Sequence, residues 1–152
     1  MNSFKVSKIA LPSPGIYHIR IGNVCDERLF YHGYLTENEF SNGLVTAIES
    51  SRKGLFHLSH NNDDGTISLF SLARNEYITA TSNRIGFNNS DKIAKFELRQ
   101  PELPSSGAVK LLVGVGMKFL AVTNNGSYLF DDEKYGYLFE FLPVKALPVN
   151  GI

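Results

Sequence analysis

The sequence predicts an all-β fold built from three copies of one four-stranded unit. In the clearest copy, residues 65–98, apolar side chains follow the opening glycine two and four places on, which is the period of a strand with one buried face. Each copy ends on a Phe-x-Leu or Phe-x-Phe motif, beginning at residues 56, 96 and 139. A single unit of this kind cannot bury its apolar side, so the copies must share one core in a closed three-fold arrangement. The opening glycines are Gly15, Gly65 and Gly107.

The strands of the second and third units are separated by residues that favour turns. In the second unit we expect strands near residues 67–69, 77–80, 85–87 and 94–98, with a tight turn at Ser82-Asn83 and a polar loop at residues 88–91. In the third unit the strands are expected near residues 109–111, 119–122 and 139–141. Asn124-Asn125-Gly126 is a strong hairpin signal there.

The first unit is longer than the other two. We take Leu29-Phe30-Tyr31 as its second strand, and the separation from Leu29 to Phe56 is 27 residues, against 19 from Tyr77 to Phe96 in the second unit. The extra residues predict an elongated hairpin over residues 31–48 that turns at Asn42-Gly43. Loops on a rigid scaffold are where binding residues concentrate. The candidate binding residues in this hairpin are Tyr34, Glu37, Asn38, Glu39, Phe40 and Asn42.

A modest group of basic residues lies in the second unit, interspersed with acidic ones. An ordinary mixed surface explains this pattern. Alternatively, basic side chains that share a face could meet an acidic filament or partner. The candidate binding residues of this group are Arg74, Arg84, Lys92 and Lys95.

Composition indicates one globular domain. A chain of 152 residues, 43% hydrophobic and 20% charged, is long enough to form a core without a metal or disulfide. Fifteen basic and fifteen acidic residues give zero net charge, which argues against nucleic-acid or heparin binding. We expect a single domain over residues 1–152, with a lead-in at 1–14, repeats at about 15–60, 65–100 and 107–145, and a tail at 146–152.

The sequence contains no recognisable catalytic or metal-binding constellation. Cys25 is the only cysteine, its neighbours Asp26 and Glu27 disfavour the thiolate, and no orienting base is evident. The four histidines lack the spacing of a zinc site, and the acidic clusters lack that of a calcium loop. We therefore predict a non-enzymatic protein without cofactor or metal. The lone cysteine and the polar start of the chain favour the cytoplasm, and no apolar run suggests a membrane span.

The repeats resemble those of β-trefoil proteins of the fascin and hisactophilin kind. The resemblance rests on the Asn-Glu-Tyr-Ile-Thr-Ala and Met-Lys-Phe-Leu-Ala-Val segments, each followed by a polar hairpin and the closing Phe motif, and it covers residues 15–145. It implies twelve strands, six forming a barrel and six forming three hairpins that cap it. It also implies a macromolecule-binding module, for which we favour actin or another cytoskeletal protein.

Two other partners stay open at this point. Residues 14–19, Pro-Gly-Ile-Tyr-His-Ile, are similar to the opening strand of fungal trefoil protease inhibitors, which suggests inhibition of a protease through a loop. A lectin is the third possibility, because tyrosine rings can stack on a sugar even though the chain has no tryptophan. The oligomeric state is not predicted.

Overall fold

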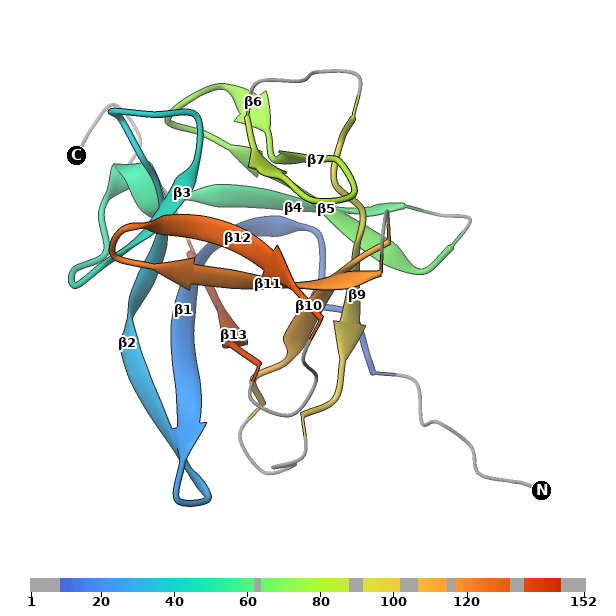
Figure 1. The fold of residues 1–152 in the computed structure, drawn as a ribbon. Coiled ribbons are helices and arrows are strands. Elements are labelled where there is room, and N and C mark those ends of the chain that lie inside the picture. Colours follow the sequence, from blue (N-terminus) through green and yellow to red (C-terminus); the bar gives the residue numbers. More distant parts are fainter. Residues whose placement is uncertain are drawn as a thin grey trace.

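The chain folds as an antiparallel all-β protein in a computed structural model that describes residues 9–61, 64–87, 92–101, 107–114, 117–131 and 136–145 (Figure 1). The strands form three groups of four, with one strand of the second group interrupted at Ile78. This confirms the predicted β-trefoil. The first group is β1 (Gly15–Cys25), β2 (Arg28–Glu37), β3 (Leu44–Ala47) and β4 (Phe56–Asn61), with a 3-10 turn η1 (Arg52–Gly54) before β4. The second is β5 (Thr66–Ser71), β6 (Glu76–Tyr77), β7 (Thr79–Ala80), β8 (Ile85–Gly86) and β9 (Phe96–Arg99), and the third is β10 (Lys110–Val113), β11 (Lys118–Thr123), β12 (Gly126–Phe130) and β13 (Leu138–Pro143).

The first and last strands of each group form a closed six-stranded barrel. Pairing runs from β1 to β4, β5, β9 and β10, and β13 returns to β1. The ring closes between β10 and β13 at Val109 and Phe139, whose backbone amides each donate to the other's carbonyl, at 2.9 and 2.7 Å. Closure leaves no barrel strand with an unpaired edge, which removes a common route to aggregation.

Three hairpins cap the barrel: β2–β3, β7–β8 and β11–β12. The predicted Asn124-Asn125 turn joins β11 to β12, between the paired residues Thr123 and Gly126. The predicted turn at Ser82-Asn83 joins β7 to β8, where the amide of Thr81 donates to the carbonyl of Arg84 at 2.9 Å. The residues of these hairpins thus come from all three groups.

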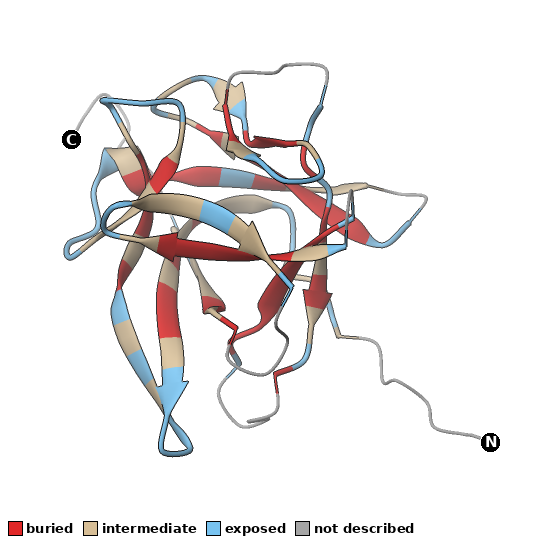
Figure 2. Cartoon of the chain, viewed as in Figure 1, coloured by how far each residue is buried: buried red, intermediate tan, exposed pale blue. Residues whose placement is uncertain are grey.

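The core repeats with the three-fold order of the strands. Phe56, Phe96 and Phe139, which open the closing motifs, are all fully buried. Buried and more exposed residues alternate along β1, β4 and β9, whereas β10 is buried throughout (Figure 2). The second strands contribute Leu35, Ile78 and Leu120 to the same core.

The structure corrects our placement of the second strand in the first group. Leu29, Phe30 and Tyr31 do not begin the capping hairpin. They lie in a two-stranded ribbon in which β1 and β2 run on beyond the barrel, down to a turn at Asp26 and Glu27 (Figure 1). Both turn residues have positive φ, 53° and 64°, as the tightest hairpin turns require. Because the side-chain period is the same along the whole ribbon, the sequence pattern did not reveal where it leaves the barrel.

Two predicted segments lie outside the described residues: the polar loop at residues 88–91 and the tail at 146–152. The proposed division of the chain into one domain with a lead-in and a tail therefore stays a prediction. No helix in the described part of the chain is long and apolar enough to cross a membrane.

Candidate functional site

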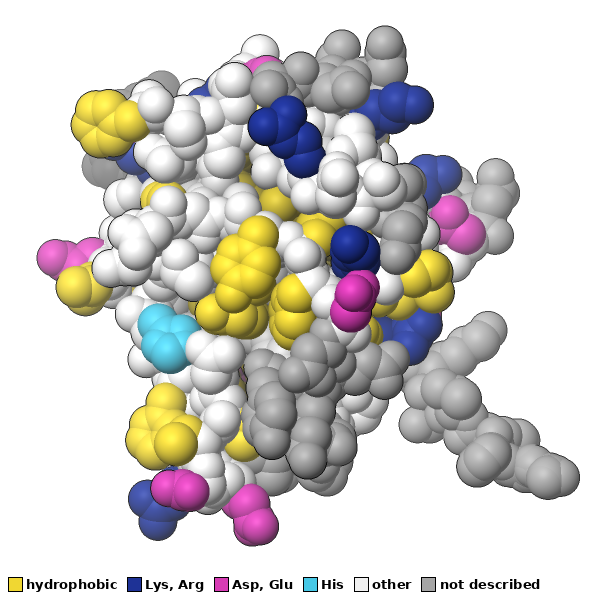
Figure 3. Space-filling view, viewed as in Figure 1, with side chains coloured by type: hydrophobic (Ala, Val, Ile, Leu, Met, Phe, Trp, Pro, Cys, Tyr) yellow, Lys and Arg dark blue, Asp and Glu magenta, His cyan; other side chains and the backbone are white. Residues whose placement is uncertain are grey.

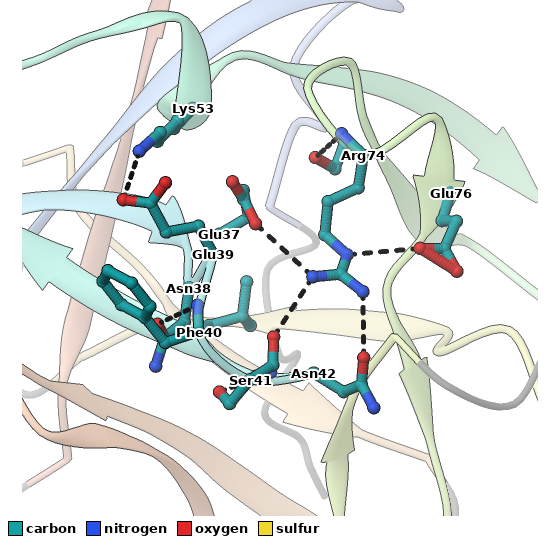
Figure 4. A network of polar contacts seen from close by, with 12 residues as sticks. Glu37, Asn38, Glu39, Phe40, Ser41, Asn42, Lys53, Arg74 and Glu76 are labelled. Atoms are coloured by element: carbon teal, nitrogen blue, oxygen red, sulfur yellow. Dashed lines mark hydrogen bonds and ion pairs between the residues drawn. The ribbon is translucent and has the colours of Figure 1, made fainter.

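Arg74 contacts two other predicted binding residues, Glu37 and Asn42, together with Ser41 and Glu76 (Figure 4). Its Nη1 atom lies 3.5 Å from Oε2 of Glu37 and donates to the carbonyl of Ser41 at 3.1 Å. Its Nη2 donates to Oδ1 of Asn42 at 2.9 Å, and its Nε donates to Glu76 at 3.2 Å. The guanidinium thus joins the turn of β2–β3 to the second group of strands.

The Arg74–Glu37 pair is well shielded from solvent, whereas Ser41, Asn42 and Glu76 are more exposed. The side chain of Arg74 is 20% exposed and that of Glu37 is 7% exposed. The guanidinium also lies over the ring of Phe87, with 4.6 Å between Cζ and the ring centroid. Glu37, Asn42 and Arg74 are therefore engaged in contacts within the protein, and a role for them in binding a partner stays a prediction.

The other predicted residues of the first group are spread along the same hairpin. Asn38 accepts a hydrogen bond from the amide of Phe40 at 3.0 Å, and Glu39 forms an ion pair with Lys53 at 2.7 Å. The ring of Phe40 is 90% exposed. Tyr34 is half-buried and meets His18 edge-on, with ring centroids 6.1 Å apart. Phe40 is the only one of these side chains that extends freely into solvent without such a contact among the described residues.

Two of the predicted basic residues are paired with carboxylates. Lys95 lies 3.6 Å from Asp64, as Arg74 lies beside Glu37. Lys92 is exposed, and its carbonyl accepts from the amide of Ala80 at 2.8 Å. Hydrogen bonds from the hydroxyl and amide of Thr66 lower the pKa of Asp64, with a smaller contribution from Lys95. Two of the four cations are thus balanced by carboxylates.

A cavity of about 480 Å³ lies among the three capping hairpins, and we call it the cap cavity. Its walls are joined across the groups of strands. The amide of Phe87 donates to the carbonyl of Asn42 at 2.8 Å, and the amide of Leu44 donates to Oγ of Ser127 at 3.3 Å. Of the predicted binding residues, Asn38, Asn42 and Arg84 line it.

A second hollow of about 340 Å³ lies where the β1–β2 ribbon approaches the third group of strands, and we call it the side pocket. Hydrophobic side chains gather beside it, over β11 and β12, on the face seen in Figure 3. The sequence analysis did not predict this site, because its residues come from five separate segments of the chain. They are Asn23, His32, Thr46, Ile48, Thr123, Asn124 and Tyr137.

Tyr137 provides the aromatic wall of the side pocket. Its ring meets Phe130 edge-on at 6.2 Å, and it packs against the hydrophobic core. Burial raises the pKa of its hydroxyl to about 12, and a hydrogen bond with Tyr128 adds to the effect. The phenol is therefore neutral at physiological pH. The contacts with Phe130 and the hydrophobic core hold its ring in place.

The polar groups of the side pocket are neutral amides, hydroxyls and an imidazole. An imidazole nitrogen of His32 contacts Oδ1 of Asn23, which links the two strands of the ribbon. Thr46 donates through Oγ1 to the carbonyl of Val122 at 3.0 Å, so its oxygen lone pairs remain able to accept. No cluster of three or more histidine, cysteine or acidic side chains suited to a metal occurs among the described residues.

Comparison with known proteins supports the fold and does not assign a family. No protein-family model matches the chain, and no curated protein matches it. The fold is similar to a solved structure of SeviL bound to asialo-GM1 saccharide, with a TM-score of 0.63 and 14% sequence identity. The similarity covers 87% of this chain and 99% of that one. The resemblance to fascin-like proteins and to protease inhibitors stays a prediction.

Proposed function

We propose that this protein is a non-catalytic carbohydrate-binding protein that takes a neutral sugar in the side pocket. The observation that carries the proposal is the pairing of a fixed aromatic ring, Tyr137, with neutral amide and hydroxyl groups in one hollow. Similarity to a structure solved with a bound saccharide supports the same class of ligand, at the level of fold. Among the three partners that the sequence left open, this one has the most direct structural support.

The chemistry of the side pocket suits a sugar. A pyranose ring has an apolar face of C–H groups that packs on an aromatic ring, and its edge carries hydroxyls that both donate and accept. Tyr137 offers the ring. Asn124 is exposed at the turn of β11–β12 and can both donate and accept through its amide.

The scaffold favours binding without a large rearrangement. Thr123 donates through Oγ1 to the carbonyl of Gly126 at 3.2 Å and accepts from the amide of Asn125 at 3.1 Å, which fixes the turn that carries Asn124. The hollow, at about 340 Å³, lies within the range of small-molecule sites, roughly 300–1,000 Å³. A prepared site loses less conformational entropy when it binds.

A glycan array followed by calorimetry with the best neutral glycan tests the proposal. The variant is Asn124→Ala, and its matched control is Asn125→Ala, which alters the neighbouring residue in the same turn but lines the cap cavity. We expect Asn124→Ala to weaken binding about tenfold, the value of one or two lost hydrogen bonds. Failure to retain any neutral glycan, or equal losses in both variants, would refute the proposal.

Actin binding, which the sequence favoured, has less support. Its basic candidates include Arg74 and Lys95, which are balanced by Glu37 and Asp64. Co-sedimentation with purified filaments at low salt tests it directly. If the protein sediments with filaments and binds no glycan, actin binding would be favoured over carbohydrate binding.

A further inference from the structure

We propose that the cap cavity is a second, separate binding site, which takes an anionic sugar and pairs its carboxylate or sulfate group with Arg84. The site differs from the side pocket in its lining and in its charge. This inference does not depend on the neutral-sugar site, because no residue lines both hollows.

Charge is the first argument. Arg84 is exposed, lines the cap cavity, and forms no side-chain hydrogen bond or ion pair with any residue that the structure describes. Among the described residues that line the cavity, none is acidic. Two carboxylates of the neighbouring strands, Glu37 and Glu76, are already paired with Arg74. An anion entering the cavity therefore meets a cation, and no described lining residue offers a competing carboxylate.

The rest of the lining explains why the ligand is a sugar rather than a bare ion. The cavity, at about 480 Å³, is far larger than one sulfate or phosphate ion. Apart from Arg84, its polar side chains are amides and hydroxyls, which suit a ligand rich in hydroxyl groups. One cation among many neutral groups fits one acidic group on a polyhydroxylated ring. The amide and hydroxyl side chains include Asn38, Ser41, Asn42, Thr81, Asn125 and Ser127.

The walls of the cavity are held in position by bonds between the hairpins. An added Cβ at Gly86 would lie 2.2 Å from the carbonyl oxygen of Asn42, so the turn of β2–β3 sits directly on β8. The amide of Phe87 donates to that same carbonyl at 2.8 Å. On the other side, Ser127 accepts from the amide of Leu44 at 3.3 Å. A prepared site of this kind spends little free energy on ordering its walls when a ligand binds.

Amide chemical shifts measured by NMR during titration test the inference. The probes are glucuronic acid and galactose 6-sulfate, with glucose and galactose as neutral counterparts and inorganic sulfate as the free anion. We expect at least one acidic sugar to shift the amides of Gly43, Gly86 and Gly126, in the three hairpins. Its affinity should exceed that of its neutral counterpart and of free sulfate. If only glucuronic acid binds, the group that pairs with Arg84 is a carboxylate. If only galactose 6-sulfate binds, that group is a sulfate.

The matched pair of variants is Arg84→Gln and Arg28→Gln. Arg28 is an exposed arginine in the ribbon, and it lines neither hollow. We expect Arg84→Gln to weaken binding of the acidic sugar at least tenfold, in line with the loss of a charge-assisted hydrogen bond. Arg28→Gln should leave it unchanged, and so should Asn124→Ala in the side pocket. The inference would be overturned if acidic and neutral sugars bound equally, or if free sulfate bound as tightly as the acidic sugar. It would also be overturned if Arg84→Gln left binding of the acidic sugar unchanged, or if Asn124→Ala abolished it.

Discussion

The guanidinium of Arg74 and the carboxylate of Glu37 lie 3.5 Å apart where the turn of β2–β3 meets the second group of strands. Each is largely buried, and Arg74 is the only cation paired with Glu37 among the described residues. The nitrogen of this pair, Nη1, also donates to the carbonyl of Ser41, while Nε donates to Glu76 and Nη2 to Asn42. One side chain therefore connects residues that are more than thirty positions apart in sequence.

Replacing Arg74 should destabilise the protein by about 2–4 kcal/mol, because Arg74→Met leaves the buried carboxylate of Glu37 without its cation. The free energy of unfolding can be measured by urea denaturation. The matched control is Arg84→Met, since Arg84 is exposed and unpaired among the described residues, and it should change stability by less than about 0.5 kcal/mol. Similar losses from both substitutions would show that the Arg74 network is not stabilising.

Gly86 should not tolerate alanine. An added Cβ would meet the carbonyl oxygen of Asn42 at 2.2 Å, and backbone cannot move aside as a flexible side chain can. We expect Gly86→Ala to cost about 1–3 kcal/mol of stability, as overpacking does. In Gly114→Ala, the control, the nearest atom is 3.9 Å away, so the thermal midpoint should change little. A neutral Gly86→Ala would contradict the close contact between the two hairpins.

Tyr137 should ionise at a pH of about 12, well above an ordinary tyrosine, because burial and Tyr128 favour the neutral phenol. A raised pKa in the folded state means that stability is unaffected below about pH 10 and falls as the pH rises from there toward 12. Ultraviolet difference titration follows the ionisation, and Tyr137→Phe assigns it. If Tyr137→Phe removes a transition near pH 10 instead, the ring is more open to solvent than the structure shows.

Thr66 should control the ionisation of Asp64. Its hydroxyl donates to Oδ1 of Asp64 at 2.6 Å and its amide at 3.1 Å, and together they lower the pKa of that carboxyl. Thr66→Val should raise the pKa of Asp64, as followed by NMR titration, and by more than Lys95→Met does. Because a lowered pKa favours the charged folded form, the associated stabilisation is present at neutral pH and fades as the pH falls below about 4. A larger effect of Lys95→Met would mean that charge, rather than hydrogen bonding, dominates.

The three buried phenylalanines that open the closing motifs should contribute comparably to stability. Phe56, Phe96 and Phe139 are each fully buried in the same core. Each change to alanine should therefore cost about 3–5 kcal/mol, measured by denaturant unfolding. Phe40→Ala is the control, because its ring is 90% exposed and should matter little to folding. A cost at only one of the three core positions would argue against a shared three-fold interior.

Much of the fold was predictable because its signals are local. Apolar residues two and four places after Gly65 predicted a strand, and Asn124-Asn125-Gly126 predicted the hairpin that the structure shows. The ribbon of β1 and β2 was not predictable, because Leu29 and Tyr34 lie on one continuous strand with one period. Only pairing with β1 and β3 distinguishes the part in the ribbon from the part in the cap.

The candidate sites were less predictable than the fold. Arg84 and Asn42 were chosen as candidates from composition and loop position, and the structure places both at the cap cavity. Tyr137, Asn124 and His32 were not chosen, because nothing in their local sequence connects them. A hollow formed by five separate segments depends on how distant strands pair, and a local sequence pattern does not reveal that pairing.

The sequence by itself determined the class of fold and its three-fold repetition, because strand period and turn chemistry act between near neighbours. The tertiary structure alone decided which polar groups meet. Arg74 is balanced by Glu37, whereas Arg84, ten residues further along, faces a cavity whose described lining residues include no acid. The physical reason is that charge pairing and cavity shape depend on distances across the closed barrel and its cap, which are set only when the three groups of strands pack together.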